Sequence, residues 1–158
     1  MAESRAERFR FLYREAEGVV DREVWRRASL PPLAIALGMT IVWLVIAPNG
    51  PRDLNSEAFI DLRVVATHLY ALVYSFALVF CAVAEYFLSA KRFADRGKPP
   101  ALAGLLPLSL LLAGAANWFQ PRSEGTMPES LVYLFDGIAI LILVWNIIEL
   151  GFGESRRR

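Results

Sequence analysis

The chain has 158 residues, of which 56% are hydrophobic and 21% are charged, and its formal net charge is +1. With a mean hydropathy of +0.40, this composition is too apolar for an ordinary soluble domain and favours a membrane protein. The small net charge argues neither for nor against a nucleic-acid partner. The only cysteine, Cys81, excludes an intrachain disulfide.

Residues 1–29 form a charged segment in which apolar side chains recur at helical spacing. Gly18 is expected to break the helix, and Asp21 to cap a second piece that carries Trp25 toward the membrane interface. Two interpretations stay open: an amphipathic helix lying on the membrane surface, or a solvated helix packed on the end of a bundle. No cleaved targeting segment is expected, because the first long apolar run begins at Leu30.

Four apolar runs follow, each long enough to cross a hydrocarbon core as a helix. The first, from Leu30 to Ala47, is uncharged for 18 residues, or about 27 Å of helix. The sequence therefore predicts an all-α, polytopic membrane protein with a four-helix transmembrane domain over residues 30–152 and a basic tail over 153–158. The expected spans cover residues 30–47, 64–88, 101–119 and 131–152.

Prolines and polar residues distinguish the spans from one another. Pro31 and Pro32 fit the first turn of the first span, whereas Pro107 lies inside the third span and is expected to kink it. The second span carries polar groups on two opposite faces, which predicts a central place in the bundle. One face holds Thr67, Tyr70, Tyr74, Cys81 and Glu85, and the other holds His68, Ser75 and Tyr86.

The basic residues are distributed unevenly. Fourteen of the 17 lie in residues 1–29, 91–98 and 156–158, and only Arg52, Arg63 and Arg122 lie in the other two loops. Under the positive-inside rule, this bias predicts that both termini face the cytoplasm.

Ionisable and amide side chains at membrane depth fall into two layers. His68, Asn117 and Asp136 lie near the outer ends of the spans, and Glu85, Asn146 and Glu149 near the inner ends. We expect Asp136 to pair with His68, Glu85 with Arg92, and Glu149 with the tail arginines. Such layers tie helices together by hydrogen bonds, or they supply a proton or solute path along the second span.

No motif indicates an active site. Metal-ligand spacings, phosphate-binding loops and nucleophile motifs are missing, and no basic and aromatic platform for nucleic acid lies outside the interface helices. We therefore expect no metal, no cofactor and no nucleic-acid partner. A small membrane enzyme built from scattered polar residues is the third of three functional hypotheses.

The segment from Ser89 to Pro100 joins the second and third spans. Gly97 suits the left-handed conformation that ends a helix, and the following prolines prevent its continuation. Asp95 is unusual, because a carboxylate in the last turn opposes the helix dipole. It is expected to be held by Arg92 or by Arg26 and Arg27, or else to be solvated.

This segment, with Arg92, Asp95, Arg96 and Gly97, resembles the most recognisable motif of the family called domain of unknown function 805. The stretches 22–25, ending in Trp25, and 147–152 are similar to the family's segments before the first span and at the end of the last. Two features depart from the family: Ala94 stands where the family usually has histidine, and the family's Asn- and Pro-containing tail after the last span is missing. The resemblance implies a bacterial inner-membrane helical bundle of no known activity.

The leading functional hypothesis is a non-enzymatic scaffold in the lipid bilayer that forms homo-oligomers or binds a membrane-protein partner. The alternative is a small transporter, channel or accessory subunit that uses the polar face of the second span. A dry centre around Tyr74, Cys81 and Glu85 would favour the scaffold, and a continuous water-accessible cavity there would favour transport.

Overall fold

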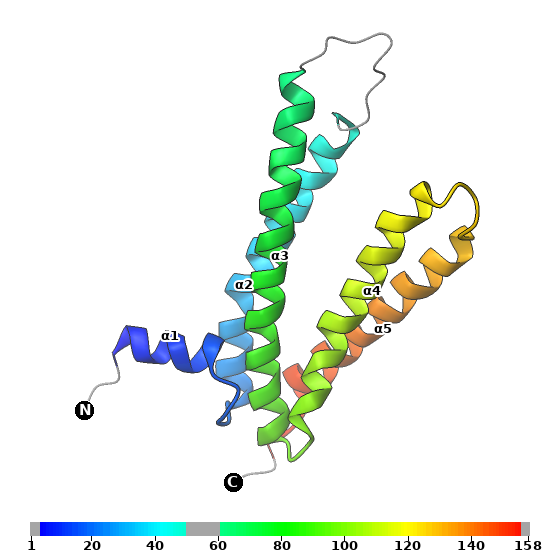
Figure 1. Cartoon of the computed structure of the whole chain (residues 1–158). Helices are drawn as coiled ribbons and strands as arrows, with labels where there is room; N and C mark the ends of the chain where they lie inside the picture. The colour runs from blue at the N-terminus through cyan, green and yellow to red at the C-terminus, as the bar shows by residue number, and fades with distance from the viewer. Residues whose placement is uncertain (1–3, 50–60, 156–158) are drawn as a thin grey trace. The chain divides into compact units, whose positions relative to one another are not determined.

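The computed structural model describes residues 4–49 and 61–155, and within them the fold is all-α (Figure 1). This confirms the predicted class, with four long helices and a short N-terminal one. Arg52 of the loop after the first span and the arginines at 156–158 lie outside the described residues. The helices are α1 (Arg5–Arg14), α2 (Arg22–Ile46), α3 (Leu62–Asp95), α4 (Leu105–Phe119) and α5 (Glu129–Phe152), with short 3-10 helices η1 (Ala47–Asn49), η2 (Pro100–Gly104) and η3 (Gln120–Arg122).

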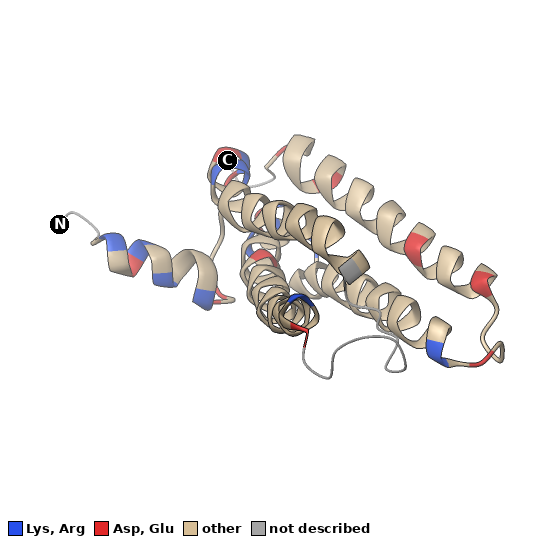
Figure 2. Ribbon diagram, turned by 90° about the horizontal axis from the view of Figure 1, so that it is seen from above, with Lys and Arg blue, Asp and Glu red and all other residues tan. Residues whose placement is uncertain are grey.

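Four helical stretches are long and apolar enough to span a membrane: Arg22–Ile46, Leu62–Asp95, Pro100–Arg122 and Glu129–Phe152. Figure 2 shows that charged residues are frequent along α1 and sparse along the long helices. The chain is therefore a multi-pass membrane protein by helix length and hydropathy.

The chain divides into two compact units. The first unit joins Met1–Ser29 to Val83–Arg158, and the second unit is Leu30–Ala82. Helices α2 and α3 run through the boundary between the units, so each unit contains a part of both.

In the second unit, the tyrosines of α3 pack against α2. The Tyr70 hydroxyl donates to the Met39 carbonyl at 2.7 Å, and the Tyr74 hydroxyl lies 2.9 Å from Thr40 Oγ1. The ring of Trp43 stacks on that of Tyr74, with centroids 5.9 Å apart. Part of the predicted polar face of α3 thus serves helix packing.

Other polar side chains of α3 bond to their own helix. Such back-bonding satisfies a hydroxyl or imidazole without a neighbouring helix, so polar groups on two faces do not require a central position. These residues therefore do not depend on neighbouring helices for their hydrogen bonds, and the predicted central place of α3 stays a prediction. Thr67 bonds to the carbonyl of Arg63, His68 Nδ1 to that of Val64, and Ser75 to that of Ala71.

Helix α2 begins before the first span and crosses the predicted boundary between residues 29 and 30 without a break. Asp21 caps it as expected, since its Oδ1 accepts from the Val24 amide at 2.7 Å. Pro31 and Pro32 consequently lie inside the helix rather than in its first turn, which corrects the prediction. Proline has no N–H, so Pro32 leaves the Ala28 carbonyl without its helical donor.

Tyr13 of α1 supplies the missing donor. Its hydroxyl bonds to the Ala28 carbonyl at 2.8 Å, and Ala28 itself is buried. Burial raises the pKa of the Tyr13 hydroxyl, so the group stays protonated and able to donate. Together with buried Leu12, this bond packs the end of α1 against the rest of the first unit, whereas residues 4–10 are exposed.

Helix α4 starts later than the predicted third span. Residues 100–104 form η2, and Pro107 is the third residue of α4, in the first turn, where a missing N–H costs least. Pro107 therefore lies near the start of α4 rather than well inside it, and the expected kink stays a prediction. Helices α4 and α5 lie side by side in the first unit (Figure 1), and both carry small buried residues: Ala113 and Ala116 on α4 and Ala139 on α5.

Replacing Tyr13 with phenylalanine is expected to leave the Ala28 carbonyl without a donor and to destabilise the first unit by about 1 kcal/mol. Thermal unfolding in detergent measures the effect. The matched control is Tyr133→Phe, because the Tyr133 side chain is exposed. Equal melting temperatures for the two variants would contradict the role given to Tyr13.

Candidate functional site

The strongest concentration of buried charge lies at the C-terminal end of α3, in the first unit. The side chains of Lys91 and Arg92 are 0% exposed, and Asp95 is 6% exposed. Burying a charge is costly unless it is paired and hydrogen-bonded, so the contacts of these groups must compensate for their lost hydration.

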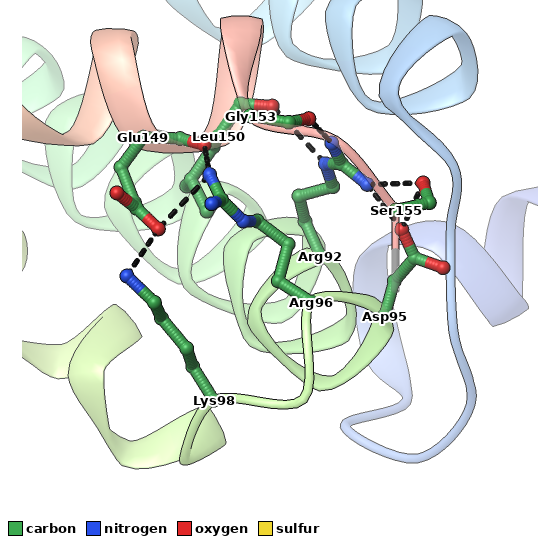
Figure 3. Close-up of polar contacts among 8 residues, drawn as sticks. All are labelled: Arg92, Asp95, Arg96, Lys98, Glu149, Leu150, Gly153 and Ser155. Carbon is green, nitrogen blue, oxygen red and sulfur yellow. Dashed lines mark hydrogen bonds and ion pairs between the residues drawn. The ribbon is translucent and has the colours of Figure 1, made fainter. Parts of the chain in front are cut away.

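Arg92 donates to the end of helix α5 (Figure 3). Its Nε bonds to the Leu150 carbonyl at 3.0 Å, and its Nη2 bonds to the Gly153 carbonyl. The last carbonyls of a helix have no partner within it. Gly153 has an extended backbone, with φ −64° and ψ 143°, and so does not form the usual left-handed cap. Arg92 therefore caps α5 from a different helix.

Asp95 neutralises Arg92. Its Oδ2 accepts from Arg92 Nη1 and from Ser155 Oγ at 2.6 Å, and Ser155 also accepts from Arg92 Nη1 at 2.9 Å. This confirms Arg92 as the partner among the expected alternatives and explains the carboxylate in the last turn of α3.

Arg26 and Arg27, the other expected partners of Asp95, make different contacts. The guanidinium of Arg26 lies over the Phe152 ring, 5.1 Å from its centroid. Arg27 pairs with Glu23, with 2.7 Å between Nε and Oε1.

Arg96 and Lys98 bind the same part of α5. Arg96 donates to the Glu149 carbonyl and pairs with its carboxylate at 2.9 Å, while Lys98 pairs with that carboxylate as well. Glu149 was expected to pair with the tail arginines, but in the described residues these two bases hold it. Gly153 permits the approach, because a Cβ there would overlap the Arg96 guanidinium.

Lys91 caps the end of α1, as Arg92 caps the end of α5. Its Nζ donates to the carbonyls of Phe11 and Leu12, the latter at 3.1 Å, and lies 4.7 Å from the centroid of the Phe11 ring. We call Lys91, Arg92 and Arg96 the carbonyl clamp, since each donates to main-chain carbonyls of another helix. The bonds from Lys91 to α1 were not predicted from the sequence. Its signal was the pair of adjacent bases, whose side chains leave a helix about 100° apart and so reach different neighbours.

The turn after the clamp forms as predicted. Gly97 has φ +69°, its amide bonds to the Ala94 carbonyl, and the Lys98 amide bonds to that of Phe93 at 2.9 Å. These two bonds complete the Schellman motif, in which glycine avoids the strain of a left-handed backbone.

Glu85 does not pair with Arg92, contrary to the expectation. Its Oε1 accepts from Ser29 Oγ at 2.9 Å, and its Oε2 is buried without a partner among the described residues. Arg92 is instead fully engaged with α5 and Asp95. Trp25, expected at the interface, is 7% exposed and packs near Gly151, where a Cβ would lie 3.6 Å from its ring.

The remaining predicted polar residues are distributed over both units. Asn117 donates to Asp136 Oδ1 at 2.9 Å in the first unit, and buried Asn146 donates to the carbonyl of Ile142 at 3.1 Å. His68 belongs to the second unit. The expected pairing of His68 with Asp136 would join the two units and stays a prediction.

No three His, Cys, Asp or Glu side chains in residues 4–49 and 61–155 form a group that could hold a metal ion. In comparisons with protein-family models, curated proteins and solved structures, none matches this chain. The resemblance to domain of unknown function 805 therefore gains no support from these comparisons and stays a prediction.

Replacing Asp95 with asparagine is expected to leave the buried Arg92 guanidinium without a counter-charge and to destabilise the protein by about 3 kcal/mol. Ser155→Ala should cost about 1 kcal/mol, because it removes only neutral hydrogen bonds. Thermal unfolding in detergent separates the two, with the exposed Glu17→Gln as control. An Asp95→Asn protein as stable as this control would refute the pairing.

Gly153→Ala is expected to push Arg96 from the end of α5 and to lower stability by about 1–3 kcal/mol, because the added Cβ overlaps the guanidinium. Gly38→Ala is the matched control, since nothing lies within 4 Å of a Cβ at that position. If both variants melted at the wild-type temperature, the close approach of Arg96 would be wrong.

Proposed function

We propose that this multi-pass membrane protein is a non-enzymatic scaffold, which associates with further copies of itself or with another membrane protein. We place it in the bacterial inner membrane with both termini in the cytoplasm, on the distribution of basic residues and the family resemblance. One observation supports the scaffold most directly. The buried cations of the carbonyl clamp are directed to carbonyls and carboxylates of the chain itself, and so fix helix ends rather than a substrate.

The clamp gives the first unit a fixed geometry. Lys91 holds the end of α1, while Arg92 and Arg96 hold the end of α5. Lys91 and Arg92 belong to the last turns of α3, and Arg96 directly follows the last residue of this helix. A scaffold needs such a rigid arrangement, because a partner then binds without the cost of ordering the chain.

The α4–α5 hairpin offers a surface for association. Gly114 on α4 and Gly137 on α5 each have nothing within 4 Å of a Cβ, so another helix can approach the backbone there. Exposed apolar side chains continue this surface, among them Leu111 at 68% and Leu141 at 70% exposure.

The alternative of a transporter or channel has weaker support. Two residues of the polar face, Tyr70 and Tyr74, bond to α2 through their hydroxyls, which is the arrangement of a packed helix pair. A solute path along this face would need those hydroxyls to exchange partners.

The test is the size of the complex that mild detergent extracts from native membranes, read by native gel electrophoresis and mass spectrometry. The wild-type chain is expected in a discrete complex heavier than one copy. Gly137→Leu should shift it to smaller species, because the new side chain fills the space needed for a partner, while its Cβ meets no described atom of the chain within 4 Å.

The exposed Ala115→Leu variant controls for added bulk on the hairpin and should leave the complex intact. A wild-type chain that migrates as a single copy would contradict the scaffold function. A complex that Gly137→Leu leaves unchanged would contradict the proposed surface on the hairpin.

A further inference from the structure

A cavity of about 260 Å³ lies between α1 and the first turns of α2, within the first unit. We propose that it binds the phosphate of a membrane lipid headgroup. This inference rests on the membrane location of the chain and not on its role as a scaffold.

The cavity has an apolar lining and a charged edge. Leu12 and Ala28 line it and are buried, and Val24 adds a third aliphatic wall. The exposed side chains of Arg8, Arg27 and Glu23 form the charged edge, and Tyr13 also lines the cavity. The Glu23 carboxylate is paired with Arg27 at 2.7 Å, so Arg8 adds a positive charge that no carboxylate of the lining balances. The site can therefore receive an apolar group and an anion together, as the headgroup end of a phospholipid requires.

Arg8 is the principal anion ligand. Among the described residues it makes no ion pair, whereas the nearby Arg10 pairs with Glu15 at 3.1 Å. A guanidinium presents planar donors that match two phosphate oxygens at once. Arg27 pairs with Glu23 through Nε, and its terminal nitrogens make no hydrogen bond within the described residues, which leaves them for a second contact.

The level of the cavity along α2 matches that of lipid phosphates. Ala28 lies two residues before Leu30, where the uncharged run of the first span begins. The bond from Tyr13 to the Ala28 carbonyl fixes α1 at this level. Arginines immediately outside a hydrocarbon span are where headgroup phosphates lie, and an apolar lining favours a lipid over a soluble phosphate.

The experiment is native mass spectrometry of the full-length chain in detergent, titrated with dioctanoyl phosphatidylglycerol. One saturable adduct is expected. Dioctanoylglycerol, which has the same tails and no phosphate, should not form it, and inorganic phosphate at equal concentration should not compete for it. Arg8→Gln should weaken the affinity at least about fivefold, as expected for the loss of a charged hydrogen-bonding partner.

Arg5→Gln is the matched control, because Arg5 is an exposed arginine of the same helix that does not line the cavity. It should keep the wild-type affinity within about twofold, well inside the effect of one charged contact. Circular dichroism checks that both variants keep their helix content.

Three results would overturn the proposal. Equal affinities for wild type and Arg8→Gln would remove the cavity as the site. An equal loss for Arg5→Gln would show general attraction to the basic helix. Inorganic phosphate binding as tightly as the lipid would exclude a lipid ligand.

Discussion

A single buried guanidinium organises the first unit. Arg92 donates to two carbonyls at the end of α5, to Asp95 on its own helix, and to Ser155 beyond α5. Its burial is tolerable because its donors meet acceptors and one carboxylate balances its charge. Lys91 and Arg96 extend the same principle to α1 and to Glu149, so three adjacent helix ends are joined through carbonyls that each helix cannot satisfy by itself.

The same rule accounts for the proline pair of α2. Pro32 frees the Ala28 carbonyl inside a helix, and the Tyr13 hydroxyl satisfies it from α1. Unsatisfied carbonyls are therefore among the points at which this chain joins one helix to another. Elsewhere, as at Ser75, a polar side chain bonds within its own helix and makes no such connection.

The sequence predicted the parts of this fold that depend on local patterns. Apolar runs defined four spans, Gly97 defined the turn, and the Asp95 anomaly led to Arg92. It could not predict that Pro31 and Pro32 lie inside α2. The Ala28 carbonyl that Pro32 leaves free finds its donor in Tyr13, 15 residues away in the chain, and this contact is not visible in a local pattern. Nor could it predict that Glu149 pairs with Arg96 rather than with the tail arginines, since the sequence does not show which of several bases near one helix end reaches the carboxylate.

The Arg92→Lys variant tests whether Arg92 caps α5, because lysine keeps the positive charge and loses the planar set of guanidinium N–H donors. Amide hydrogen exchange in detergent is the measurement, with amides of the first turns of α5 as the internal reference. Exchange in the last two turns of α5 is expected to quicken about tenfold relative to that reference, because these turns lose their cap. Unchanged protection at the end of α5 in this variant would contradict the capping role of Arg92.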